Sequence, residues 1–73
     1  MIQVTAINRD KHDVITVSNA DAESAAKIAV SLTSFPYLRI VDGTWTLVYP
    51  GRCLVSRERL AHIIETHADV VLA

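Results

Sequence analysis

The sequence predicts an α+β fold in which a four-stranded, mainly antiparallel sheet carries two helices, in the order ββαββα. Three observations lead to this class: a two-residue alternation at the start, small and apolar residues at helical spacing after it, and an Asp-Gly turn between two apolar runs. With 73 residues and no linker or repeat, the chain is expected to form one domain, residues 1–73.

The first two strands are predicted from residues 2–17. Residues 2–7, IQVTAI, alternate apolar and polar side chains, which is typical of a half-buried strand. Residues 8–13, NRDKHD, are rich in turn formers and lead into the β-branched run VITV at residues 14–17. These segments therefore predict a hairpin.

A helix is predicted to follow the hairpin. Ser18 stands three residues before Asp21, the spacing of a capping box that would start the helix there. Pro36 is expected to end it, because the residue before proline is pushed out of helical geometry. The stripe predicted to face the sheet is Ala25, Ile28, Ala29 and Leu32.

A second hairpin is the strongest local prediction of the sequence. Asp42 and Gly43 lie between β-branched and apolar runs and are expected to form a two-residue turn, both at positive φ. In that register Ile40 faces Trp45. The other residues predicted on this inner face are Leu38, Leu47 and Tyr49.

The last element is predicted to be a helix packed on the sheet. Ser56 is a suitable N-cap, and Val55 and Leu60 occupy the two positions of a hydrophobic staple. Pro50 and Gly51 close the strand before it. The predicted core of the whole fold is Val4, Ile15, Val17, Ile28, Leu32, Leu38, Ile40, Trp45, Leu47, Leu60, Ile63 and Ile64.

The opposite face of the second hairpin carries a different set of residues. Tyr37, Val41 and Val48 alternate with the core residues and lie beside Arg39. If no helix covers this face, they form an apolar strip suited to a protein partner.

Composition excludes several classes of function. Seven basic residues against eight acidic ones, a net charge of −1, argue against sequence-independent DNA binding, which depends on neutralising phosphates. The lone Cys53 cannot form an internal disulfide, which favours the reducing cytoplasm. No apolar run approaches the length of a membrane span, and the N-terminus lacks the pattern of an export signal.

The sequence contains no recognisable catalytic, metal or cofactor site. His62 and His67 are five residues apart, so they do not share a helix face as zinc ligands would. Neither glycine belongs to a phosphate-binding loop, and no base is identified that would activate Cys53. We therefore expect a protein that is not an enzyme, with catalysis requiring a site assembled between subunits.

Three arginines form the one charged cluster, Arg52, Arg57 and Arg59. Arg57 and Arg59 fall in the first turn of the predicted second helix, where the helix dipole disfavours positive charge. Such a departure is typical of an interaction surface, although three solvated arginines cost little and are an equal alternative. An acidic protein surface, or RNA held by a larger complex, would suit them. Arg39 and Tyr49 are further candidate contacts.

A family resemblance carries the functional hypothesis further. From MIQVTAINRDKHD through VDGTWTLVYPGRCLVSRERL to HADVVLA, the chain resembles, over its full length, the small RNA polymerase-binding regulators made by lytic phages of Xanthomonas. These proteins combine transcription inhibition with antitermination. No diagnostic motif carries the resemblance, so it assigns no residue roles.

The resemblance implies binding to bacterial RNA polymerase near the β′ N-terminal region and the β flap, in the cytoplasm of a host cell. Binding there would disturb the sigma contacts needed for −35 recognition and hinder terminator hairpins, with NusA as an assisting factor. Two alternatives remain: another phage inhibitor of a host complex, such as a defence nuclease, or a small nucleic-acid-binding module.

Overall fold

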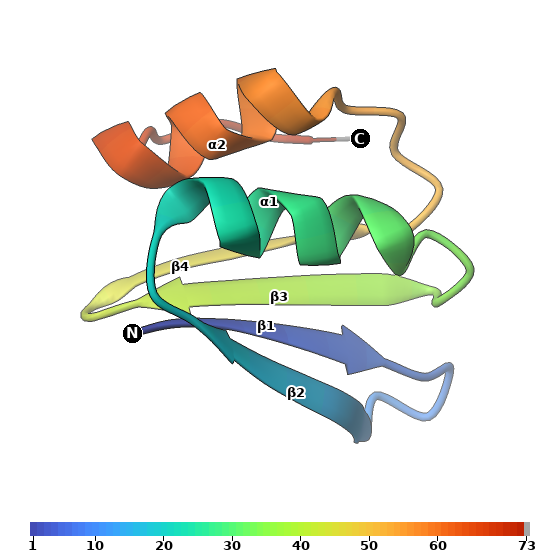
Figure 1. Ribbon diagram of the computed structural model, residues 1–73. Helices are drawn as coiled ribbons and strands as arrows, with labels where there is room; N and C mark the ends of the chain where they lie inside the picture. The colour runs from blue at the N-terminus through green and yellow to red at the C-terminus, as the bar shows by residue number, and fades with distance from the viewer. Residues whose placement is uncertain (73) are drawn as a thin grey trace.

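The computed structural model, which describes residues 1–72, confirms the α+β prediction and the element order ββαββα. Its elements are β1 (Ile2–Ile7), β2 (Asp13–Asn19), α1 (Ala22–Ser31), β3 (Tyr37–Asp42), β4 (Trp45–Pro50) and α2 (Arg57–Thr66). All neighbouring strands are antiparallel, in the order β2-β1-β3-β4. The two helices lie side by side on one face of this sheet, so the fold has two layers (Figure 1).

The first hairpin has a five-residue loop, residues 8–12, and an irregular ladder. The Asn8 side chain accepts hydrogen bonds from the backbone N–H groups of Asp10 and His12, each at 3.0 Å, which orders the turn. Lys11 takes a positive φ of 63° there. The β1–β2 register shifts between Ala6 and Ile7, which is a β-bulge at the start of β2.

The start of α1 differs from the prediction. Ser18 lies inside β2, which continues to Asn19, so it does not cap the helix. Asp21 is the N-cap, and its carboxylate accepts a 2.8 Å hydrogen bond from the backbone N–H of Ser24. That bond, reinforced by the Ser24 side chain, lowers the pKa of Asp21.

The second hairpin turns one residue later than predicted. Its loop is Gly43-Thr44, with Asp42 opposite Trp45 and Ile40 opposite Leu47. Gly43 has a φ of 62°, and positive φ at the first loop residue is typical of a type II′ turn. Because this register differs from the predicted one by two residues, each side chain keeps its predicted face.

Most of the predicted core is buried, and one edge residue is not. Val4, Leu38, Ile40, Leu47, Leu60, Ile63 and Ile64 are buried, whereas Val17, Ile28 and Leu32 are half-buried. Ile15 is 42% exposed, so its assignment to the core was wrong. The reason is its place on β2, an edge strand with a neighbouring strand on one side only, beside the small alanine side chains of α1.

Trp45 is half-buried and anchors the end of α2. Its ring stacks on that of His67, with centroids 5.2 Å apart and an interplanar angle of 5°. The indole N–H points at the carbonyl oxygen of Ala68 at 3.4 Å, and Nε2 of His67 lies 2.8 Å from an Asp42 carboxylate oxygen. His67 itself is the left-handed C-cap of α2, with φ 50°. These contacts join the helix end to the second hairpin.

The different burial of Leu38 and Ile15 predicts that the same substitution will lower the free energy of unfolding by different amounts at the two positions. Leu38→Ala removes a fully buried side chain and should lower the free energy of unfolding by about 2–5 kcal/mol. Ile15→Ala, at the exposed edge, should lower it by less than about 1 kcal/mol. Urea unfolding followed by circular dichroism measures both, and equal losses would contradict this account of β2.

Candidate protein-binding surface

The face of the sheet that points away from both helices is open. Leu38 and Ile40 of β3 point toward the helices, so the residues that alternate with them point the other way. Within residues 1–72 no helix covers this side (Figure 1). The apolar strip predicted on the second hairpin depended on this face being free of a helix, and that is the arrangement found. Its β3 and β4 residues are Tyr37, Arg39, Val41, Thr46 and Val48.

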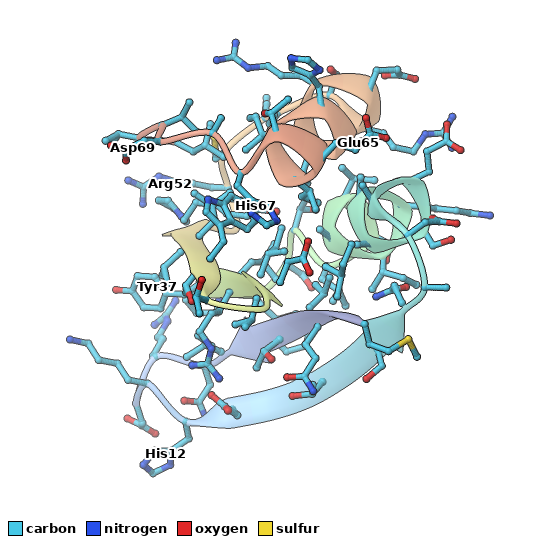
Figure 2. All side chains as sticks on the ribbon, turned by 90° about the vertical axis from the view of Figure 1, so that its left-hand side faces the viewer. His12, Tyr37, Arg52, Glu65, His67 and Asp69 are labelled. Atoms are coloured by element: carbon cyan, nitrogen blue, oxygen red, sulfur yellow. The ribbon has the colours of Figure 1, made fainter. Side chains whose placement is uncertain are left out.

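The apolar centre of this face is formed by three neighbouring strands. The register places Ile7 of β1 opposite Tyr37 of β3, and Val48 of β4 opposite Arg39. Tyr37 and Val48 are 38% and 55% exposed, whereas Ile7 is buried beneath them at 7%. Together with Lys11 and Arg39 these side chains line a shallow hollow. Figure 2 shows Tyr37 on the side of the sheet away from α2 and His67.

A second hollow adjoins the first through Tyr37. It lies where the α1–β3 and β4–α2 connections meet, and Arg9 and Arg52 stand on it. Gly51 holds the two connections together: its N–H donates to the carbonyl oxygen of Pro36 at 3.0 Å. Any side chain there would collide with the carbonyl oxygen of Phe35, so the position requires glycine.

We call the two hollows together the Tyr37 surface. Its members are Ile7, Arg9, Lys11, Thr33, Ser34, Phe35, Pro36, Tyr37, Arg39, Val48, Pro50 and Arg52. It gathers four of the seven lysine and arginine residues of the chain around an exposed aromatic ring. Arg39 donates to Asp13 at 2.7 Å, which offsets one of these charges. An apolar centre with a cationic rim is suited to a protein partner that carries carboxylates.

The arginines that are adjacent in the sequence do not form one site. Arg52 belongs to the Tyr37 surface, whereas Arg57 lies between the two helices with Glu23 and comes within 3.8 Å of Glu58. Arg59 lines a separate hollow near Leu54 and Val71. The three side chains therefore spread over different parts of the surface, because a loop and a helical turn direct them apart.

Tyr49 is not a surface contact. It is 3% exposed and faces the helices from β4, opposite Leu38. Burial, with a smaller contribution from Cys53, raises the pKa of Tyr49 to about 12. Its selection as a candidate contact was wrong because it belongs to the inner face that the alternation itself predicts.

Arg9 and Lys11 were missed in the sequence. They lie in the tip of the first hairpin, which the turn-rich run predicts without indicating what lies beside it. The pairing of Ile7 with Tyr37 brings that tip next to the second hairpin. The nearness of the two hairpins follows only from the order of the strands, in which β1 pairs with both β2 and β3.

Other kinds of site find little support in the described chain. Among residues 1–72 no group of three or more histidine, cysteine, aspartate or glutamate side chains is placed to hold a metal ion. Neither α1 nor α2 is long and apolar enough to cross a membrane. No protein-family model, curated protein or solved structure matches this chain.

Alkaline unfolding tests the burial of Tyr49. Because burial raises the pKa of Tyr49 to about 12, its phenol stays protonated in the folded state at pH values where the unfolded chain, with the ordinary tyrosine pKa of about 10, already ionises. The free energy of unfolding should therefore fall as the pH rises above about 10, by about 1.4 kcal/mol from this group between pH 7 and pH 11. Tyr49→Phe should remove that part of the loss, measured by urea unfolding at pH 7 and pH 11.

Tyr37→Phe is the matched control, because it changes the other tyrosine, which is exposed. It should lose stability with pH as the wild-type protein does. If the two variants respond alike, the inward position of Tyr49 is contradicted.

Proposed function

We propose that this protein is a non-catalytic regulator that binds bacterial RNA polymerase in the cytoplasm of a host cell. The partner region is the β′ N-terminal region and the β flap, at the mouth of the RNA exit channel. The sequence resemblance to small phage regulators supplies the polymerase as partner. The structural observation that supports binding is the Tyr37 surface, which has an exposed aromatic and aliphatic centre with four cationic side chains around it.

The chemistry of this surface favours association with an acidic protein region. Arginine forms two parallel hydrogen bonds with a carboxylate, and Arg9 and Arg52 are both exposed at the rim. Tyrosine and arginine are enriched among the residues that dominate binding energy. A standard interface covers about 800 Å² per partner. That is about a sixth of the 4613 Å² that this small chain exposes, so one face is sufficient.

Occupation of one place on the polymerase would produce two effects without any chemical step. A protein seated at the flap would disturb the sigma contacts needed at the −35 element and lower initiation at host promoters. The same protein beside the exit channel would hinder the RNA hairpin of an intrinsic terminator and increase read-through. NusA would assist the second effect.

A second candidate is a nucleic-acid-binding module. An exposed aromatic ring among cations is also the arrangement on which single-stranded RNA bases stack. Binding of that kind would weaken steeply with salt, roughly in proportion to the number of phosphates neutralised. An inhibitor of a different host complex, such as a defence nuclease, would use the same surface for another acidic partner.

Two paired substitutions test the proposal and its surface together. Arg9→Ala/Arg52→Ala removes two cations from the Tyr37 surface, and Arg57→Ala/Arg59→Ala removes two from the start of α2. Both variants lose the same net charge, so general electrostatic attraction changes equally. We expect the first to bind purified polymerase at least tenfold more weakly, and the second to change affinity by less than threefold.

The functional measurement is transcription in vitro on a sigma-dependent promoter and across an intrinsic terminator. Wild-type protein should lower initiation and raise read-through, and the Arg9/Arg52 variant should do neither at the same concentration. If wild-type protein does not bind polymerase, the proposed function fails. If only the Arg57/Arg59 variant is impaired, the function stands and the contact lies at α2.

A further inference from the structure

The outer edge of β2 is an unusual feature for a small sheet. β2 is an end strand and pairs with β1 alone. Between Val14 and Asn19 it has no charged residue and no proline, which commonly protect such edges from pairing, and the bulge beside Ile15 is the one protective feature of the strand. Val14 and Ile15 are 49% and 42% exposed. The edge therefore offers unpaired backbone groups beside exposed apolar side chains.

The side chains of β2 divide cleanly between its two faces. Ile15 and Val17 are opposite Ala6 and Val4, so they point to the helix side. Thr16 is opposite Thr5 on the open face, where the two hydroxyl oxygens are 3.1 Å apart. A strand added outside β2 would thus have apolar neighbours, Ile15 and Val17, on the helix side of the sheet and a hydroxyl neighbour, Thr16, on the open side.

We infer that β2 pairs antiparallel with β2 of a second copy of this chain, with Thr16 on the two-fold axis. In an antiparallel pair, opposite residues must both direct their backbone groups toward the partner or both away. For two identical strands, a residue must therefore lie on the axis. With Thr16 there, Ile15 faces Val17 of the second copy and Val14 faces Ser18.

This register is self-complementary, and its neighbours are less so. Within residues 14–18 it places Ile15 opposite Val17 on the helix side and brings no charged side chain into a pair. Asp13 and Asn19 would stand opposite each other only at the ends of the strands, beyond the bulge. With Ile15 on the axis, the carboxylate of Asp13 would stand opposite Val17. With Val17 on the axis, Ile15 would stand opposite Asn19, which is already buried against β1 and hydrogen-bonded to the Ile2 carbonyl at 3.4 Å.

The inferred dimer has an eight-stranded sheet, because two four-stranded sheets join edge to edge. The bulge at the Asp13 end limits the regular ladder to the middle of β2, so the dimer should be weak and form with increasing concentration. Tyr37 and Val48, on β3 and β4, stay exposed in it, so this inference does not depend on the proposed function.

Disulfide trapping tests the register in a Cys53→Ser background. Thr16→Cys places the new thiols opposite each other on the axis and should give a disulfide-linked dimer on mild oxidation. Ser18→Cys is the matched control on the same face, where the two thiols would be four positions apart along the strands. At about 3.3 Å per residue, that separation exceeds the reach of a disulfide.

We expect most of the Thr16→Cys protein and little of the Ser18→Cys protein to be cross-linked. Equal cross-linking of the two variants, or none in either, would overturn the inference.

Sedimentation equilibrium tests the dimer without new cysteines. Ile15→Lys would set a charge among the apolar pairs and should weaken dimerisation at least tenfold. Val71→Lys makes the same charge change at a 93% exposed site in the C-terminal segment and should leave it unchanged. Circular dichroism melts verify that both variants fold. A wild-type protein that stays monomeric at millimolar concentration, or equal effects of both substitutions, would overturn the inference.

Discussion

The close packing of α1 on β1 and β2, and of α2 beside α1, is the constraint on which the rest of the structure depends. The buried residues of α1 are Ala22, Ala25, Ala26 and Ala29, whose small side chains let the helix lie near β1 and β2. Two ten-residue helices packed beside each other cover one face only. The opposite face and the β2 edge are consequently left open to solvent, and both candidate interaction surfaces lie there.

The fold could be predicted because its signals are local. Alternation of period two identifies the strands, and the Asp-Gly-Thr segment identifies the second hairpin even though its turn is one residue later. A shift of two in register preserves the faces, so Leu38 and Ile40 were still assigned correctly to the core. Ile15 could not be placed in this way, because an edge strand has the same periodicity as an inner one.

The candidate site was only partly predictable, for a related reason. The strip containing Tyr37 and Val48 follows from alternation, together with the condition that no helix covers it. The cationic rim depends on which segments become neighbours in space: Arg9 and Lys11 arrive through the pairing of β1 with β3. Conversely, Arg57 and Arg59 are close to Arg52 in sequence, yet the turn into α2 separates their side chains.

Methyl cross-saturation in the presence of bacterial RNA polymerase most directly tests the claim that the open sheet face makes the contact. Val48 on that face is 55% exposed, and Leu54 and Val71 on other parts of the surface are 96% and 93% exposed. Since all three are accessible, differences in signal loss report contact and not exposure alone. The account expects the Val48 methyl signals to weaken while those of Leu54 and Val71 persist. Loss at Leu54 and Val71 with Val48 unaffected would contradict it.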